Sequence, residues 1–132
     1  MSNLEKKNII ITGASGGIGS SIIKKLNDAG ANILASWTRI EKLKKHKKNF
    51  ESIKILKFDI SQSDKIEEFI ENATSELGGS LDGIVNNAGI TKDNLAIRMS
   101  LDEWQKVINI NLTSTFLMSK FAIKKMLKNK SG

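Results

Sequence analysis

A glycine-rich segment near the start of the chain is the clearest candidate for chemistry. Residues 12–19 read Thr-Gly-Ala-Ser-Gly-Gly-Ile-Gly, between an apolar run and a stretch with helical spacing. Glycine permits a sharp turn and lets a phosphate approach the backbone without a Cβ in its way. The first turn of a helix adds unpaired N–H groups and partial positive charge. The segment therefore predicts a turn that binds a pyrophosphate. Its candidate binding residues are Gly13, Ser15, Gly16, Gly17, Ile18 and Gly19.

The spacing of these glycines separates the segment from two other phosphate-binding loops. Gly13-x3-Gly17-x-Gly19 differs from the commoner Gly-x-Gly-x-x-Gly fingerprint. A Walker loop would continue with Lys and then Ser or Thr, whereas Ser20 and Ser21 follow here. A nucleoside triphosphatase is therefore not favoured. A tight strand-to-helix turn without a ligand stays open as the alternative.

Short apolar runs alternate with segments of helical spacing along the chain. Strands are predicted at residues 8–12, 32–36, 52–60 and 81–87. One helix is expected from Ile18 to a stop at Gly30, and a very basic one at 39–48. A third helix is expected to be capped by Ser63 and ended by Gly78 and Gly79.

The last part of the chain is predicted to be helical. Ser100 and Glu103 have the spacing of a capping box, a break is expected at 109–111, and a final helix at 112–128. The order of elements, β-α-β-α-β-α-β-α-α, is typical of a parallel sheet covered on both faces. We therefore expect one α/β domain over residues 1–132.

Composition narrows the classes of function. The chain has 132 residues, no cysteine and a net charge of +7, and 19 of its 21 basic residues are lysine. Without cysteine a thiolate metal site is excluded, and no metal site is expected. The lysines lie between apolar positions of helical stretches without interleaved aromatic residues, so a nucleic-acid binder is not favoured. No targeting or membrane-spanning segment is visible, which favours a cytoplasmic location.

Four motifs occur together in the order of a known family. Residues 12–19 match a Thr-Gly-x3-Gly-x-Gly signature, and residues 86–89 read Asn-Asn-Ala-Gly. Asp59 is followed by Ile60, and Asn111 by Leu112, at matching spacing. In these motifs the chain resembles the classical short-chain dehydrogenases/reductases. The stretch at 86–99 is similar to that of the 3-oxoacyl-acyl-carrier-protein reductases. The resemblance spans the whole chain but reaches only about half of a family member.

The resemblance implies a fold, an activity and a cofactor site. It implies a Rossmann-type sheet of order 3-2-1-4 and NADPH-dependent reduction of a 3-oxoacyl group carried by acyl-carrier protein. The nicotinamide cofactor carries the hydride. Of the family's Asn-Ser-Tyr-Lys tetrad only Asn111 is present, and the chain contains no tyrosine. We therefore expect this chain to bind cofactor without catalysing alone. Further cofactor contacts implied by the resemblance are Asp59, Ile60, Asn86, Ala88 and Gly89.

The end of the second predicted strand bears on the choice of nicotinamide cofactor. A site that prefers NAD usually has a carboxylate there to bind the ribose 2′-hydroxyl. The run Ala35-Ser36-Trp37-Thr38-Arg39 has none, and Arg39, helped by Ser36 or Thr38, could meet a 2′-phosphate. NADP(H) is therefore favoured over NAD(H). Against this, Gly16 stands where NADP-dependent relatives often carry a basic residue.

Partners and alternatives complete the expectations. Family members form tetramers, and the fourth strand would be an exposed edge here, so we expect a homo-oligomer or aggregation. Lys128 and Lys130 fall where the family's reductases carry a basic patch that docks acyl-carrier protein, but a solvated helix end, favoured by the helix dipole, is the preferred interpretation. Asn86 and Asn87 could serve structure or cofactor. A non-catalytic dinucleotide-binding module and another reductase of the same family remain alternative functions.

Overall fold

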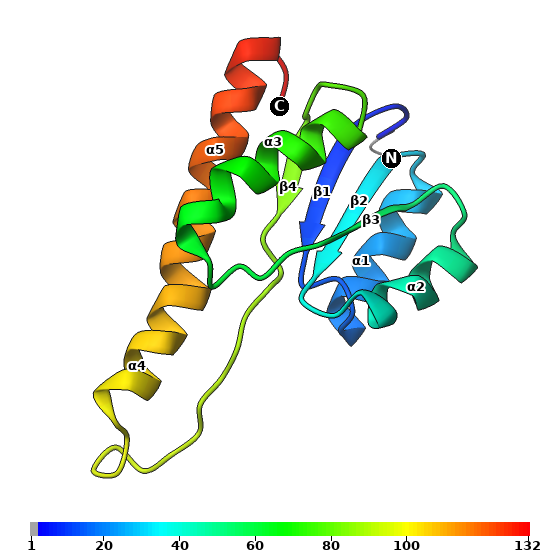
Figure 1. Cartoon of the computed structure of the whole chain (residues 1–132). Helices are drawn as coiled ribbons and strands as arrows, with labels where there is room; N and C mark the ends of the chain where they lie inside the picture. Colours follow the sequence, from blue (N-terminus) through cyan, green and yellow to red (C-terminus); the bar gives the residue numbers. More distant parts are fainter. Residues whose placement is uncertain (1–2) are drawn as a thin grey trace.

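Four parallel strands form a single sheet with helices on both faces (Figure 1). The structure is a computed structural model and describes residues 3–132, apart from the side chain of His46. The strands are β1 (Asn8–Thr12), β2 (Asn32–Trp37), β3 (Lys54–Lys57) and β4 (Gly83–Val85). Their order in the sheet is β3-β2-β1-β4, which confirms the predicted topology and leaves β4 at an edge.

Two helices cover each face of the sheet. Figure 1 shows α1 (Gly17–Asp28) and α2 (Ile40–Asn49) on one face, and α3 (Ile66–Glu76) and α5 (Ser114–Asn129) on the other. The short α4 (Leu101–Ile108) continues into α5 and extends beyond the sheet. No helix within residues 3–132 is long and apolar enough to cross a membrane.

The alternation of side chains along the strands divides the core in two. Ile10 of β1 packs with buried residues of α3 and α5, whereas Ile9 and Ile11 pack on the side of α1 and α2. A strand buried on both faces must be apolar at every position, because successive side chains point in opposite directions. This is why the middle of β1 consists of three consecutive isoleucines, Ile9 to Ile11.

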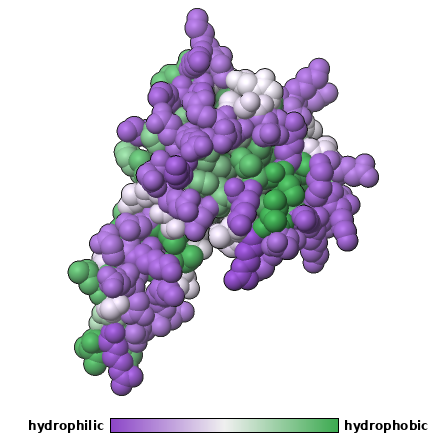
Figure 2. Space-filling view, viewed as in Figure 1, coloured by the Kyte–Doolittle hydropathy of each residue, from purple (hydrophilic) through white to green (hydrophobic). Residues whose placement is uncertain are grey.

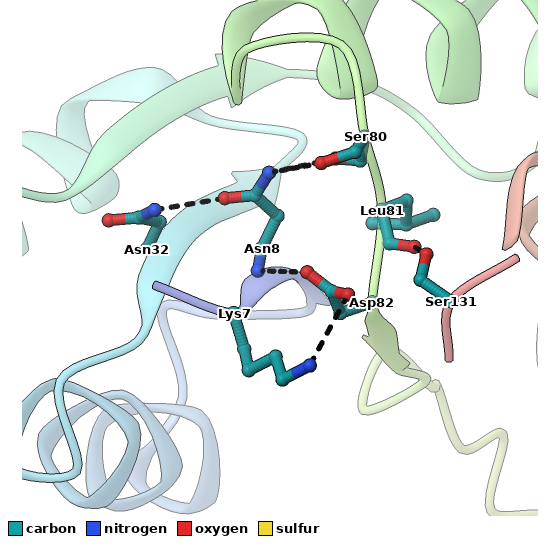
Figure 3. A network of polar contacts seen from close by, with 7 residues as sticks. All are labelled: Lys7, Asn8, Asn32, Ser80, Leu81, Asp82 and Ser131. Carbon is teal, nitrogen blue, oxygen red and sulfur yellow. Dashed lines mark hydrogen bonds and ion pairs between the residues drawn. The ribbon is translucent and has the colours of Figure 1, made fainter. Parts of the chain in front are cut away.

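A polar network fixes the amino ends of the strands (Figure 3). The buried Asn8 donates through Nδ2 to the carbonyl and the hydroxyl of Ser80, each at 3.0 Å. Its Oδ1 accepts from Asn32 Nδ2 at 3.0 Å, and its backbone N–H donates to Asp82 Oδ2 at 2.8 Å. The network ties the starts of β1, β2 and β4 together. The polar loops at the opposite ends of the strands are therefore where the sheet can present a site.

Two predicted strands are shorter than expected. The third was expected at 52–60, but β3 covers only Lys54–Lys57, because the chain turns at Asp59. The Asp59 carboxylate accepts the N–H of Ser61 at 2.9 Å, and its carbonyl accepts the N–H of Gln62 at 3.1 Å. The fourth was expected at 81–87, and β4 covers Gly83–Val85. At the carboxyl ends of both strands, the residues that were expected to extend the strand, 58–60 and 86–87, form loops instead.

Two local predictions in the helical parts are wrong. Ser63 does not cap α3: it begins a short 3-10 turn, η1 (Ser63–Lys65), and Lys65 precedes α3 without a side-chain cap. The break expected at 109–111 is instead a π-helical turn, η2 (Asn109–Thr113), which joins α4 to α5 without interruption. The predicted capping box of Ser100 and Glu103 is confirmed, since both of its hydrogen bonds are present.

Candidate functional site

The glycine-rich segment forms the turn between β1 and α1, as predicted. Gly13 has a φ of +64°, and a Cβ there would lie 2.6 Å from the Cα of Ala88. A side chain at this position would thus be strained and would also collide with backbone. Glycine at position 13 is required for the turn to lie against the loop that follows β4.

Hydrogen bonds hold these two loops together. Asn87 donates through Nδ2 to the carbonyl of Gly13 at 2.9 Å, and the N–H of Ala88 donates to Thr12 Oγ1 at 3.2 Å. Asn87 therefore has a structural role. Asn86 points elsewhere, because its Nδ2 donates to Ser119 Oγ on α5 at 3.0 Å.

The start of α1 is open to solvent. Gly16 precedes the helix and Gly17 begins it, and a Cβ at either position would meet nothing within 4 Å. Ile18, the next residue, is also exposed. The protein's own packing therefore does not require glycine at 16 and 17. A helix start with accessible N–H groups and no side chains in front of it suits a phosphate group.

A cleft of about 110 Å³ lies beside this turn, at the carboxyl ends of the strands. Parallel α/β sheets characteristically bind ligands at this edge. The loops after all four strands contribute to the cleft, together with one residue of η2. Its lining residues are Thr12, Gly13, Ser36, Trp37, Thr38, Phe58, Asp59, Ile60, Ala88, Gly89, Ile90 and Ile110.

The cleft brings together about half of the predicted site residues. Those that line it are Gly13, Thr38, Asp59, Ile60, Ala88 and Gly89. Of the others, Gly16, Gly17 and Ile18 surround the exposed start of α1, and Gly19 is buried beneath the turn. Arg39 is exposed on the connection to α2 and does not line the cleft. Ser15 lines a separate groove between α1 and α2.

Ser36 carries an orphaned polar atom in this cleft. Its side chain is only 1% exposed, and its Oγ has no hydrogen-bond partner in the structure. A buried hydroxyl without a partner is costly, so native proteins normally satisfy such groups. Together with the open helix start, this atom fits a ligand that brings polar groups into the cleft. Sequence reasoning named Ser36 only as a helper of Arg39, and its burial could not be read from the local sequence.

Asn111 lies in the π-helical turn and forms two hydrogen bonds with the loop after β4. Its Oδ1 accepts the N–H of Ile90 and its Nδ2 donates to the carbonyl of Ile90, each at 2.8 Å. Its own backbone carbonyl accepts the hydroxyl of Thr115 at 2.8 Å. Because Ile90 lines the cleft, Asn111 shapes the cleft wall through this contact.

Acidic and metal-binding groups are sparse around the cleft. Within residues 3–132, excluding the His46 side chain, no three His, Cys, Asp or Glu side chains are grouped to hold a metal ion. Asp59 is the carboxylate among the lining residues. The lining residues include no histidine, lysine, cysteine or tyrosine.

The parallel sheet, the helices on both of its faces and the cleft at the carboxyl ends of its strands are those of a Rossmann-type α/β fold. The sequence profile described as short chain dehydrogenase matches residues 7–132, and the chain belongs to that family.

Its relatives include 3-oxoacyl-acyl-carrier-protein reductases. The reductase FabG of Buchnera aphidicola is 39% identical over 134 residues, which are 98% of this chain and 53% of the relative. That of Rickettsia felis is 40% identical over 136 residues, 100% of this chain and 53% of the relative. A glucose/ribitol dehydrogenase of the family from Brucella melitensis has a similar structure, with a TM-score of 0.85 and 31% identity over 93% of this chain and 53% of that one. The chain spans about half the length of the relatives it matches.

Proposed function

We propose that this chain is the NADP(H)-binding part of a reductase that converts a 3-oxoacyl group on acyl-carrier protein to the 3-hydroxyacyl form. The observation that carries the proposal is the contact of Gly13 with Ala88. It places the two family motifs side by side at the cleft. Relatives named as 3-oxoacyl-acyl-carrier-protein reductases, at 37–40% identity over nearly the whole chain, support the choice of substrate.

The residues of the cleft have distinct roles in this proposal. The open helix start at Gly16 and Gly17 would hold the pyrophosphate of the dinucleotide, with Ser15, Ile18 and Gly19 forming the rest of the turn. Asp59 and Ile60 would meet the adenine. Ala88 and Gly89, which carry almost no side chain, would leave room for a ribose. Asn86, through its hydrogen bond to Ser119, would hold this loop against α5.

When bound, the nicotinamide supplies the hydride. The chain's own residues would bind and orient the nicotinamide. Asn111 would position the loop after β4, through its hydrogen bonds to Ile90. The two hydrogen bonds between the Asn111 side chain and the backbone of Ile90 hold the π-helical turn in place. We propose that the backbone of this turn anchors a proton relay. The chain contains no tyrosine, so we expect no proton donor of the family's type within it.

Self-association of the chain is part of the proposal. The exposed apolar residues of α4, η2 and α5 follow helical spacing, which is typical of a helix face that packs on a partner. They are Leu101, Trp104, Leu112, Phe116, Ile123 and Leu127. Figure 2 shows further hydrophobic residues at the tip of the extension that holds α4. We propose a homo-oligomer through this face, with acyl-carrier protein as the substrate-bearing partner.

Titration with NADPH and NADH, beside an assay of NADPH oxidation with an acetoacetyl thioester, tests the proposed function. We expect NADPH to bind more tightly than NADH, and we expect no turnover by this chain alone. Failure to bind either dinucleotide would contradict the proposal. Turnover would refute the inference from the missing tyrosine while leaving the cofactor assignment intact.

A further inference from the structure

The net positive charge of the chain is concentrated in one short segment. Residues 44–57 contain six lysines and one glutamate, a net charge of +5, whereas the whole chain has a net charge of +7. The segment covers the second half of α2, the connection that follows it and β3. Among the described residues, none of this segment lines the cleft at the strand ends. The cofactor proposed for the cleft therefore does not account for this charge.

Three lysines of this segment project from the outer side of α2. Leu43 is fully buried and packs in the same cluster as Ile53, so it marks the inner side of the helix. Because a helix turns by about 100° per residue, Lys44, Lys45 and Lys48 point away from the core, and all three are exposed. Lys48 follows the other two by four and three residues, which makes the side chains neighbours. We call these three lysines the basic surface.

Other lysines of the segment have a structural use. Lys47 donates through Nζ to the carbonyls of Glu51 and Ile53, each at 2.6 Å, and so ties the end of α2 to the start of β3. Lys54 donates to the carbonyl of Glu76 at the end of α3. Within the described part of the chain, the ammonium groups of the basic surface form no such hydrogen bond. They are therefore not required to hold α2 in place.

The charge of the basic surface is also uncompensated. Several lysines elsewhere in residues 3–132 are paired with carboxylates, and these pairs are Lys7–Asp82, Lys24–Asp28, Lys65–Glu68, Lys124–Glu67 and Lys125–Glu71. None of these pairs includes Lys44, Lys45 or Lys48, and Glu41, one turn earlier on α2, is in none of them either. Like charges four residues apart destabilise a helix, so an anion bound to this surface would relieve a repulsion.

The composition of α2 indicates which kind of anion the surface suits. The helix contains no arginine and no Phe, Tyr or Trp, so it lacks the guanidinium forks and aromatic rings that commonly bind nucleic acids. The exposed large hydrophobic residues of the described chain all lie outside α2, so the helix has no apolar side chain to insert into a membrane. Each lysine ammonium is a point charge that can pair with one carboxylate. These features favour an acidic protein.

We propose that the basic surface of α2 is a docking site for an acidic helix of a partner protein, whose carboxylates recur every three or four residues. That spacing matches the spacing of Lys44, Lys45 and Lys48. Complementary charge speeds the encounter with such a partner and orients it. The inference goes beyond the proposed function and does not depend on it, because the surface shares no residue with the cleft.

A labelled acidic peptide tests the inference against the whole 132-residue chain. The probe is a helical peptide with glutamates three and four residues apart, followed by fluorescence anisotropy. The triple variant Lys44→Gln/Lys45→Gln/Lys48→Gln removes the charge of the basic surface, and glutamine has nearly the helix propensity of lysine. Thermal unfolding followed by circular dichroism checks that each variant is as folded as the parent chain.

Two further variants separate the position of the charge from its amount. In Lys25→Gln/Lys92→Gln/Lys106→Gln the same charge is removed from exposed lysines outside the basic surface, none of which is in an ion pair among the described residues. The triple replacement of Lys44, Lys45 and Lys48 by arginine keeps the charge in place.

We expect the glutamine variant of the basic surface to weaken peptide binding by roughly tenfold, because each exposed ion pair contributes about two- to fivefold. The control variant should change the affinity by less than about twofold, since charges far from the contact are screened by salt. The arginine variant should bind as the parent does. Equal losses in the two glutamine variants would mean that only the net charge matters, and would overturn the inference, as would failure of the parent chain to bind the peptide.

Mapping on the parent chain gives a readout that needs no variant. In an NMR titration with the same peptide, the largest amide shifts should fall on residues 44–48. Shifts confined to other elements would overturn the inference. A single-stranded oligonucleotide with the same number of charges and phosphatidylglycerol vesicles are titrated in parallel. Tighter binding of either one than of the peptide would identify a nucleic acid or a membrane as the partner and would overturn the assignment to an acidic protein.

Discussion

Asn111 and Ile90 are joined by two hydrogen bonds of 2.8 Å, in which the side-chain amide of Asn111 satisfies both the N–H and the carbonyl of Ile90. Asn111 belongs to the π-helical turn η2, and Ile90 belongs to the loop after β4. The two residues lie 21 positions apart in sequence. One amide thus couples the long helix of α4, η2 and α5 to the wall of the cleft.

Replacing this amide should loosen the loop after β4. In Asn111→Ala we expect the N–H of Ile90 to exchange with solvent faster than in the parent chain. The free energy of unfolding should fall by about 1–2 kcal/mol, because two partly exposed hydrogen bonds are lost. Hydrogen exchange followed by NMR measures the exchange rate of the Ile90 amide, and urea unfolding measures the free energy of unfolding. Asn109→Ala is the control, since among the described residues the Asn109 side chain bonds to Gln105 of the adjoining α4 and not to the loop after β4. Equal exchange of Ile90 in both variants would contradict the role of Asn111.

The sequence predicted the fold because each segment carries its own signal. The unbroken apolar run of β1 and the glycines at 78 and 79, both with φ of +98°, are local features that later packing leaves unchanged. The π-helical turn at Asn109–Thr113 was missed because asparagine has low helix propensity and suggests a break. Tertiary contacts, such as the hydrogen bond from the N–H of Ile90 to the side chain of Asn111, stabilise the helix there.

The site was predicted less completely than the fold. Glycines 13 and 16 were assigned the same role, although only Gly13 is in close contact with backbone, and this difference depends on Ala88 from a distant loop. The burial of Ser36 also arises from packing between elements. No local pattern carries that information.

Alanine at Gly13 should damage the fold, whereas alanine at Gly16 should be tolerated. In Gly13→Ala the residue would need a φ of +64° and would bring its Cβ to 2.6 Å from the Cα of Ala88. We expect a loss of at least ~2 kcal/mol in the free energy of unfolding. Gly16 has a φ of −78° and open space in front of it, so Gly16→Ala should cost at most about 1 kcal/mol. Urea unfolding of both variants tests this, and similar losses would contradict the assignment.

Removing the unpartnered hydroxyl of Ser36 should affect the stability of the fold and the affinity for NADPH differently. Ser36→Ala removes a buried oxygen without a partner, so stability should stay the same or rise by up to about 1 kcal/mol. If that oxygen bonds to the cofactor, NADPH affinity should fall. Thr74→Val is a matched control, because Thr74 Oγ1 on α3 is likewise buried without a partner and lies outside the cleft. Calorimetric titration of both variants is decisive: unchanged NADPH affinity in Ser36→Ala would remove Ser36 from the binding site.

The start of α4 should weaken at acidic pH. Hydrogen bonds from the backbone N–H of Ser100 and from its hydroxyl lower the pKa of Glu103 below the usual range of a glutamate. A carboxylate whose pKa is lower in the folded state stabilises the fold above its unfolded-state pKa, and this contribution is lost as the pH falls through the folded-state pKa. NMR titration should therefore show the Ser100 amide shifting together with the Glu103 carboxyl. In Glu103→Gln that shift should disappear, and its persistence would show that another group causes it.

The most direct test of the account is an NMR titration of the isotopically labelled chain with NADPH, followed at each backbone amide. If the glycine-rich turn binds the dinucleotide, the amides of Gly13, Gly17 and Gly19 should show saturable shifts, together with that of Ala88 across the cleft. Amides that stay unmoved through the titration, or shifts confined to residues away from this turn, would contradict it.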